Sequence, residues 1–366
     1  IYKDIGKLKE AEIATRKAIE LDPKLAEAYL HLGEILKAIG KFEEAELLLK
    51  KSIKFKPNFA LAYLNLGSIL VILNKVKEAE IVTRKAINLK PNDYLAHRNL
   101  GDILNLIGKH LEAKEMLTKA LEADPHNSDI ISDLIYTLSM ILDLDEAEDY
   151  LIKLNRSLQK GQIINPCKVS YLEDNPSKQL KRAIDFYNYK YKKEKNKLNY
   201  IKKKKIHIGY FSADFRAHPV MFLISRIIEL HDLSQFKVYI YSFTNKEDKY
   251  TQSIKNEALS FREINRLSDL EAVNLARNDK LDIAIDLNGL TQDNRVSIFF
   301  YRVAPIQINY LGYAGSMGSK SYDYILADKV LIPEENKKFY SEQVLYLPNC
   351  TYPHDNTRKI TGNKFN

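Results

Sequence analysis

The amino-terminal part of the chain repeats with a fixed period of 34 residues, and this period constrains the fold more than any other feature. Prolines, glycines and alanines keep the same spacing: Pro23, Pro57, Pro91 and Pro125; Gly33, Gly67 and Gly101; Ala11, Ala45, Ala79, Ala113 and Ala147. Such a period is typical of helix–turn–helix repeats, whose helix pairs bury their apolar faces only when they stack. The sequence therefore predicts an α-solenoid over residues 1–143, beginning with the end of an earlier repeat at 1–23.

The recurring small residues have definite places in each predicted helix pair. Gly33 on the first helix and Ala45 on the second, with their equivalents, allow the two helices to cross closely. Each glycine costs ~1 kcal/mol of helix propensity. Gly40 and Gly108 are predicted to end the first helix in the left-handed conformation, with Asn74 as the tolerated substitute. Each proline separates consecutive repeats, because the residue before a proline avoids the helical conformation.

A polar column also recurs with this period on the first helices: His31, Asn65, Asn99 and Asp133. In a stacked array this column should face the concave groove. Side-chain amides there can hydrogen-bond the backbone of an extended peptide without reading its side chains. The alternative is a solvated polar position that binds nothing. We expect a polypeptide partner in this groove.

These repeats resemble the tetratricopeptide repeat family. The resemblance is clearest in Ala28-Tyr29-Leu30-His31-Leu32-Gly33, followed by Phe42-Glu43-Glu44-Ala45. It implies an array of paired helices that presents a peptide-binding groove.

A helical connector and a lysine-rich linker are predicted over residues 144–205. The whole chain has a formal net charge of +8. The segment 190–205, with nine lysines and one glutamate, accounts for all of that excess. Aromatic residues lie within or beside it: Phe186, Tyr187, Tyr189, Tyr191 and Tyr200. Lysines interleaved with aromatics can bind nucleic acid, but a solvated helix (177–191) and linker explain the same pattern, so we expect no nucleic-acid partner.

Cysteine usage and hydropathy exclude several classes of protein. Two cysteines, Cys167 and Cys350, are too few for a disulfide scaffold and suit a reducing cytosol. Neither cysteine lies in a metal-binding pair, and the Asp-x-Asp motif at Asp143 and Asp145 falls in the repeat region, so we expect no metal site. Because the sequence has no apolar run of about 18 residues and no apolar leader, we expect a cytoplasmic protein without a membrane partner.

From residue 206 onward, short apolar runs alternate with helical stretches. The runs expected to be strands are 206–211, 236–243, 261–264 and 281–287. The stretches expected to be helices are 220–230, 246–259 and 267–277. This alternation predicts a Rossmann-like, doubly wound parallel sheet over residues 206–366. In such sheets, ligands bind beyond the carboxyl ends of the strands.

Three loops carry candidate functional residues, and the first two of them follow predicted strands. In the first, Pro219 should hold His218 extended at the start of a helix, where the helix dipole favours neutral imidazole, the form a general base needs. The alternative is a histidine that only caps or packs. The second loop spans residues 286–291, and the third carries glycines within 310–318. Those glycines allow backbone amides to approach a phosphate or sugar, although a plain turn explains them equally well.

The region from residue 206 to 348 resembles the amino-terminal half of the catalytic region of the O-linked N-acetylglucosamine transferase family. The matching motifs are His207-Ile208-Gly209-Tyr210 with Ser212, Asp214-Phe215 and His218-Pro219; Asp286-Leu287-Asn288-Gly289 with Thr291; Arg302 with Ala304-Pro305-Ile306-Gln307; Leu311-Gly312-Tyr313 with Gly315; and Asp323-Tyr324-Ile325 with Asp328. Tetratricopeptide repeats directly before this region are the order found in the family.

The resemblance implies the first lobe of a two-lobed GT-B glycosyltransferase. Such enzymes transfer N-acetylglucosamine (GlcNAc) from UDP-GlcNAc to Ser or Thr of polypeptides, with inversion, without a metal and without another cofactor. His218 matches the histidine regarded as the catalytic base or an essential site residue. Substrate binding is expected from Asp214, Asn288, Gly289, Thr291, Gly312 and Tyr313. A related branch that uses GDP-fucose leaves the sugar donor open.

The sequence departs from the family pattern at two positions. Leu290 replaces an aromatic or histidine, so it offers no polar contact, and Ala314 replaces a proline. The family continues into a second lobe that binds most of the UDP, and we expect nothing after Pro348 to supply it. We therefore expect the 366-residue chain to be inactive by itself. A non-catalytic peptide-binding scaffold is the remaining alternative.

Overall fold

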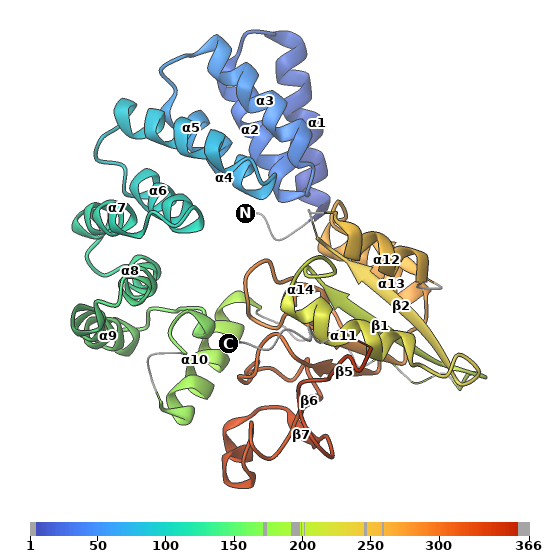
Figure 1. Cartoon of the computed structure of the whole chain (residues 1–366). Coiled ribbons are helices and arrows are strands. Elements are labelled where there is room, and N and C mark those ends of the chain that lie inside the picture. The colour runs from blue at the N-terminus through green and yellow to red at the C-terminus, as the bar shows by residue number, and fades with distance from the viewer. Residues whose placement is uncertain are drawn as a thin grey trace, which may run out of the picture. The chain divides into compact units, whose positions relative to one another are not determined.

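A computed structural model of the chain describes residues 5–170, 174–191, 198, 200, 202–244, 247–257 and 260–357 (Figure 1). The chain divides into two compact units, Ile1–Asp174 and Asn175–Asn366. The first unit is helical and the second is an α/β unit. Each has its own buried hydrophobic clusters.

The first unit is a run of helices in which each packs on the next. The helices are α1 (Ile5–Leu21), α2 (Ala26–Ala38), α3 (Phe42–Phe55), α4 (Ala60–Ile72), α5 (Val76–Leu89), α6 (Tyr94–Leu106), α7 (His110–Ala123), α8 (Ser128–Met140) and α9 (Leu144–Gln159), with the 3-10 turn η1 (Pro166–Lys168). The pairs α2–α3, α4–α5, α6–α7 and α8–α9 are the predicted repeats. The predicted α-solenoid is confirmed.

The recurring glycines lie where two helices touch. A Cβ atom on Gly67 would stand 2.3 Å from Oγ1 of Thr83, and one on Gly101 would stand 2.6 Å from Cγ of Leu117. Gly33 has a similar contact with Leu49. In every case the partner belongs to the second helix of the same repeat. The expected close crossing of helices is confirmed, because no larger side chain fits without displacing its neighbour.

The turns inside the repeats confirm a second prediction. Gly40, Asn74 and Gly108 have positive φ angles of 84°, 60° and 78°, which place them in the left-handed region. Leu142 is their equivalent in the last helix pair and also has a positive φ of 60°. A leucine in this conformation is strained, and its side chain gains nothing from the position because it is 81% exposed.

The predicted connector of residues 144–205 is divided between the two units. Helix α9 packs on α8 as the second helix of a repeat, and Leu154 of α9 is fully buried. Helix α10 (Pro176–Lys190) is the helix expected at 177–191, and it lies in the second unit. There the hydroxyl of Tyr187 hydrogen-bonds that of Ser321 at 2.5 Å. Much of the lysine-rich linker lies outside the described residues.

The second unit contains a sheet of seven parallel strands in the order β3-β2-β1-β4-β5-β6-β7. The strands are β1 (Ile206–Ser212), β2 (Phe236–Ser242), β3 (Phe261–Glu263), β4 (Ile283–Asp286), β5 (Ile306–Asn309), β6 (Tyr324–Ala327) and β7 (Gln343–Tyr346). The helices are α10, α11 (Pro219–Glu229), α12 (Lys249–Glu257), α13 (Asp269–Asn278) and α14 (Val296–Phe300), with the 3-10 turn η2 (Glu334–Phe339). The predicted Rossmann-like parallel sheet is confirmed.

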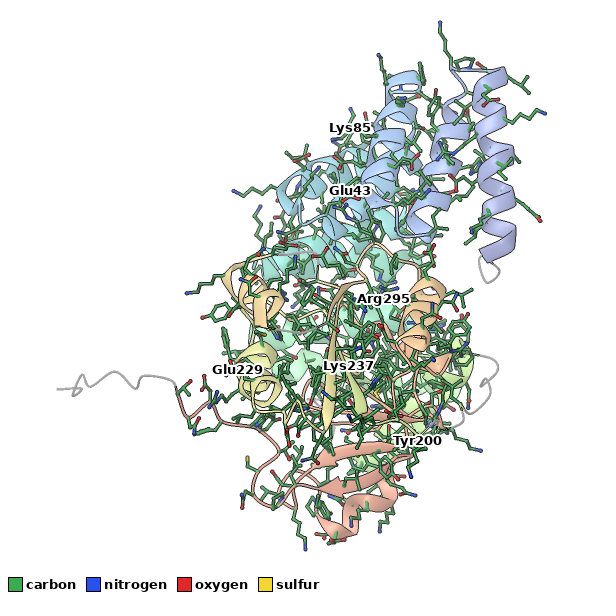
Figure 2. The ribbon with its side chains drawn as sticks, turned by 90° about the vertical axis from the view of Figure 1, so that its right-hand side faces the viewer. Glu43, Lys85, Tyr200, Glu229, Lys237 and Arg295 are labelled. Carbon is green, nitrogen blue, oxygen red and sulfur yellow. The ribbon has the colours of Figure 1, made fainter. Side chains whose placement is uncertain are left out.

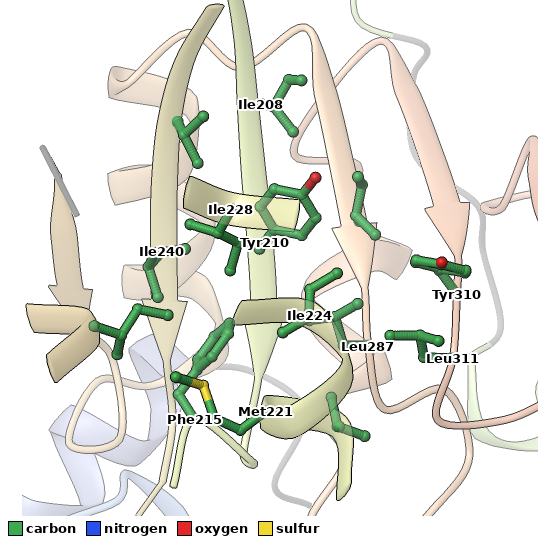
Figure 3. Packing of buried hydrophobic residues seen from close by; sticks show 14 of the residues in the cluster. Ile208, Tyr210, Phe215, Met221, Ile224, Ile228, Ile240, Leu287, Tyr310 and Leu311 are labelled. Carbon is green, nitrogen blue, oxygen red and sulfur yellow. The ribbon is translucent and has the colours of Figure 1, made fainter. Parts of the chain in front are cut away.

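A cluster of buried apolar side chains in this unit joins α11 to the central strands (Figure 3). Ile224 and Ile228 of α11 pack in the same cluster as Tyr210 of β1 and Ile240 of β2. The last five residues of β1 and the last five of β2 are all buried, because parallel strands are covered on both faces. Phe215, just after β1, is fully buried in the same cluster and ties the following loop to the core.

The strand order creates one topological switch point. From β1 the chain builds β2 and β3 on one side, and it then crosses over to place β4 on the other side of β1. The loops that leave β1 and β4 therefore diverge at neighbouring strand ends. In open parallel sheets, this is where a crevice for a ligand forms.

Candidate functional site

The side chain of Asn288 joins the loops that leave β1 and β4. Its Oδ1 accepts hydrogen bonds from Oγ of Ser212 at 3.0 Å and from the amide N–H of Ala213 at 2.9 Å. Its Nδ2 donates to Oδ2 of Asp214 at 2.9 Å. Asn288 is fully buried, so these bonds are shielded from water. Residues from two expected site motifs, 212–214 and 288, are thereby brought together.

Asp214 is held in place from several sides. Besides Asn288, Nη2 of Arg216 donates to Oδ1 of Asp214 at 3.0 Å. The amide N–H of Asp214 donates to Oγ of Ser212 at 2.9 Å. The residue is 7% exposed. A carboxylate with two strong donors and little solvent has a fixed orientation, which suits it to orient a neighbouring group.

His218 is the N-cap residue of α11, and its backbone is extended, as predicted from Pro219. Its Nδ1 accepts from the amide N–H of Val220 at 3.3 Å and lies 3.7 Å from Oδ2 of Asp214. Within the described residues, its Nε2 makes no hydrogen bond, and a third of the side chain is exposed. Nε2 is therefore available to a ligand at the switch point.

The loop after β4 is built around Asp286, which the sequence analysis did not select as a binding residue. This fully buried carboxylate accepts from the amide N–H groups of Asn288 at 2.9 Å and Gly289 at 3.1 Å, and from the hydroxyl of Tyr322 at 2.6 Å. Burial raises the pKa of Asp286, and the three donors oppose that shift only in part. The feature of the sequence that could have pointed to Asp286 is an acidic residue at the end of an apolar run.

Gly289 and Thr291 have local roles in the same loop. Gly289 has a positive φ of 56°, and a Cβ there would stand 2.6 Å from Cβ of Tyr313. The hydroxyl of Thr291 donates to the carbonyl of Asn288 at 2.8 Å. Arg295, labelled in Figure 2, anchors the segment that follows, because Nη2 donates to Oδ1 of Asp269 at 2.6 Å. The loop is thus held at both ends.

The glycines of the third loop, 310–318, serve packing. A Cβ on Gly312 would lie 2.2 Å from the carbonyl oxygen of Leu287, so this glycine lets the two loops touch. Its amide N–H already donates to Tyr310, and that of Gly318 donates to Ser316. These observations favour the plain turn over the phosphate-binding loop. Substrate binding by Gly312 stays a prediction.

Tyr313 is anchored in the same loop. Its ring is mostly buried, and its carbonyl accepts from Nδ2 of Asn309 at 2.9 Å. Glu342, before β7, holds the far end of the loop by accepting from Oγ of Ser316 at 2.8 Å and from the amide of Met317 at 2.6 Å. Burial raises the pKa of Glu342, against the effect of these donors.

The polar column of the repeat unit has two kinds of members. Nδ2 of Asn65 donates to Oε1 of Glu34 at 2.8 Å, and Nδ2 of Asn99 donates to Oγ of Ser68 at 3.2 Å. Each bond joins two consecutive repeats. Within the described residues the Oδ1 atoms of both asparagines accept no hydrogen bond, so they can accept from a peptide N–H. His31 is exposed and contacts Glu34 at 3.3 Å.

Asp133 stands apart from this column because it is buried and paired. Nε of Arg98 donates to it at 2.9 Å, and Nζ of Lys168 also contacts it. It joins η1 to α6 and α8 and cannot donate a hydrogen bond to a peptide. Burial, together with the nearby Asp133 carboxylate, raises the pKa of Asp102 to about 7, against the attraction of Arg98 and Lys168.

The described part of the chain has neither a membrane-spanning helix nor a cluster of metal ligands. None of its helices has the length and apolar character needed to cross a bilayer. No group of three or more His, Cys, Asp or Glu side chains among these residues is placed to hold a metal ion.

Comparison with known proteins identifies both regions of the chain. The family model described as "Glycosyl transferase family 41" matches residues 180–361. Tetratricopeptide repeat models match residues 1–25, 14–46, 60–93 and 96–127. The first match includes the β1 and β4 loops described above, and the second set covers the 34-residue period.

Curated relatives match over part of their length. A probable UDP-N-acetylglucosamine–peptide N-acetylglucosaminyltransferase of Arabidopsis thaliana (SEC) is 32% identical over 157 residues, or 43% of this chain and 16% of that protein. The Caenorhabditis elegans UDP-N-acetylglucosamine–peptide N-acetylglucosaminyltransferase is 30% identical over 158 residues, or 43% of this chain and 14% of that protein. The matched segments thus span only a small part of these relatives.

A solved structure supports the fold. A mutant of the Thermobaculum terrenum O-GlcNAc transferase aligns with a TM-score of 0.62 and 23% identity, covering 93% of this chain and 59% of that one. At this identity the likeness shows the shared fold. The family matches, taken by themselves, show that residues 180–361 are similar to glycosyl transferase family 41 and follow an array of tetratricopeptide repeats.

Proposed function

We propose that this chain is part of a protein O-GlcNAc transferase, which moves GlcNAc from UDP-GlcNAc to Ser or Thr hydroxyls of polypeptides. The observation that carries the proposal is the position of His218. Its open Nε2 lies at the switch point of a family 41 sheet, beside Asp214, which Asn288 and Arg216 hold in place. The names of the relatives support UDP-GlcNAc as the donor and a peptide as the acceptor.

In the proposed reaction, Nε2 of His218 accepts the proton of the acceptor hydroxyl. The freed oxygen forms a bond to the anomeric carbon of GlcNAc from the face opposite the diphosphate. The bond between that carbon and the diphosphate oxygen breaks, and UDP leaves with the electron pair. A single displacement of this kind inverts the anomeric configuration, and the chain's own residues supply the base without a metal ion or other cofactor.

The tautomer of His218 decides whether this step is possible. While Nδ1 accepts from Val220, the proton of neutral imidazole sits on Nε2, which then donates and cannot act as a base. If Nδ1 instead carries the proton and donates to Asp214, Nε2 becomes the acceptor. This hydrogen bond requires Nδ1 and Oδ2 of Asp214 to come closer than their present 3.7 Å. We propose that Asp214 selects this second tautomer in the active state.

The acceptor polypeptide is proposed to bind the groove of the repeat unit. The free Oδ1 atoms of Asn65 and Asn99 are one repeat apart and accept from backbone N–H groups. His31 is exposed at the equivalent position of an earlier repeat. Contacts to backbone give affinity with little dependence on acceptor sequence. We also propose a cytoplasmic location, in line with the cysteine usage.

Transfer is tested with the full-length product of the gene. It is incubated with a peptide mixture and either UDP-GlcNAc or GDP-fucose, and modified peptides are identified by mass. We expect peptides to be modified with UDP-GlcNAc as the donor. The variant His218→Ala should lose most of this transfer activity. The matched control His354→Ala, whose side chain is exposed, should keep the full activity. Full activity of His218→Ala contradicts the assigned base. Use of GDP-fucose corrects the donor, and the absence of any transfer favours the scaffold.

Groove binding is measured separately on this chain. The affinity for an extended peptide should fall in the double variant Asn65→Ala with Asn99→Ala. The control Asn88→Ala lies on α5, a second helix of a repeat. Unchanged affinity in the double variant contradicts the groove proposal, whatever the protein transfers.

A further inference from the structure

The loop that carries His218 is also held by two residues that lie outside the family motifs. Oδ2 of Asp248 accepts from the amide N–H of Ala217 at 2.5 Å. Oγ1 of Thr251 donates to the carbonyl of Phe215 at 2.7 Å. Asp248 and Thr251 lie between β2 and the first turn of α12, more than thirty residues beyond the loop in the sequence. The two contacts lie on either side of Arg216.

The group that makes these contacts is itself rigid. Oδ1 of Asp248 accepts from the amides of Tyr250 at 2.9 Å and Thr251 at 3.1 Å, so Asp248 caps α12. The amide of Asp248 in turn donates to Oγ1 of Thr251 at 3.3 Å. Thr251 is 1% exposed. Burial acts to raise the pKa of Asp248, but the amides of Ala217, Thr251 and Tyr250 outweigh it and lower the pKa. The carboxylate therefore stays ionised and keeps accepting.

The order of the strands explains how these contacts hold the loop after β1. Strand β1 lies between β2 and β4. Asn288, after β4, binds the start of the loop at Ala213. Asp248 and Thr251, after β2, bind its end at residues 215 and 217. The loop is therefore held from both neighbouring strands, and the last anchored amide is one residue before His218.

We propose that Asp248 and Thr251 are positioning residues that fix the backbone before His218 and so set where Nε2 points. Among the described residues, neither of them makes a hydrogen bond or ion pair with His218, and both act through Ala217 and Phe215. The proposal rests on the proposed function for its catalytic consequence. Its structural part, which we call the Asp248 clasp (Asp248, Thr251, Phe215 and Ala217), is measurable without any substrate.

The clasp is tested on this chain by hydrogen exchange in Asp248→Ser. Serine is a good helix cap but is too short to reach Ala217 as well. We expect the amides of Tyr250 and Thr251 to keep their protection, while that of Ala217 exchanges about tenfold faster, as the loss of one charge-assisted hydrogen bond allows. The matched control is Asp93→Ser, at an Asp that caps α6 through two amides and, in the part of the chain that the structure describes, makes no hydrogen bond to another loop. Unchanged exchange at Ala217 overturns the clasp.

The catalytic consequence is measured on the full-length product. Asp248→Ser and Thr251→Val should lower kcat about tenfold to a hundredfold and leave KM for the sugar donor unchanged, because a misplaced base slows the chemical step without weakening donor binding. Thr251→Ser keeps the hydroxyl and should restore kcat. A general loss of folding would not lower kcat in Thr251→Val while leaving it unchanged in Thr251→Ser. Faster exchange at Ala217 with an unchanged kcat overturns the positioning role. A parent protein that transfers nothing refutes the proposed function, and the exchange result still decides the clasp.

Discussion

Asn288→Ala should destabilise the second unit more than any substitution of a surface polar residue. The change removes the acceptor for Ser212 and Ala213 and one donor to Asp214, in a place with no exposure to water. The buried hydroxyl of Ser212 and the buried amide of Ala213 each lose a neutral hydrogen bond, and the carboxylate of Asp214 loses a charge-assisted one. At about 1 kcal/mol for each neutral bond and about 2 kcal/mol for the bond to the carboxylate, the expected loss is about 4 kcal/mol.

The assay must separate the two units. Because the chain has no tryptophan, intrinsic fluorescence is a poor reporter. Hydrogen exchange of the amides in β1 and β4, followed against denaturant, reads the free energy of unfolding of the second unit alone. The control is Asn294→Ala, which removes one bond from Nδ2 to Thr291 and should cost about 1 kcal/mol. A loss below about 1.5 kcal/mol for Asn288→Ala would refute the reasoning, since three buried bonds cannot be that weak together.

Asn288→Asp gives the same prediction a pH dependence. The new carboxyl has the shape of the amide but faces Oδ2 of Asp214 without a proton to donate. Burial and like charge raise its pKa, so the folded state favours the protonated form. The variant should therefore be most stable at low pH and lose stability relative to the parent as the pH rises through that pKa. A difference in unfolding free energy that does not change with pH would contradict this arrangement.

Three further predictions concern the repeat unit. Leu142→Gly should raise its unfolding free energy by about 1 kcal/mol, measured by far-UV circular dichroism, because glycine removes left-handed strain from an exposed residue. Lys114→Glu should destabilise it, and adding Asp143→Lys should recover part of the loss, because Lys114 contacts Asp143 at 3.3 Å; purely additive losses would contradict the pairing. Asp102→Asn should stabilise the unit above pH 7, where the raised pKa of about 7 makes the ionised Asp102 costly to the folded state. At a pH well below the ordinary pKa of an Asp side chain, Asp102 is protonated in both the folded and the unfolded state, and the substitution should give no gain. An equal gain in unfolding free energy at both pH values would contradict this reasoning.

The repeat unit shows how far a local pattern reaches. Each position recurs every 34 residues, so one set of contacts is repeated along the array and the sequence states it several times. The left-handed turns at Gly40 and Gly108 and the close crossing at Gly67 followed from residue type alone. Asp133 was the exception. It occupies the same column as Asn99, but Lys168 lies outside the period and pairs with it.

The α/β unit was predictable at the level of its elements, with smaller errors at their ends. The helix expected from residue 246 begins at Lys249, because Asp248 caps it. The short strands β5, β6 and β7 were not assigned individually from their apolar patterns. Runs of four residues carry too little periodicity to distinguish a strand from a loop.

The sequence by itself determined the repeat array, the alternation of strands and helices, and the loop in which His218 stands. Only the tertiary structure decided the order of the strands, and with it which loops meet. Asn288 reaches Ala213 across 75 residues, and Asp248 reaches Ala217 across 31. The physical reason is that hydrophobic periodicity encodes how each element buries its own face, whereas strand order depends on pairings between distant segments. The loop before His218 is anchored by such pairings, whereas the contacts of the His218 side chain itself, with Asp214 and Val220, are local in the sequence.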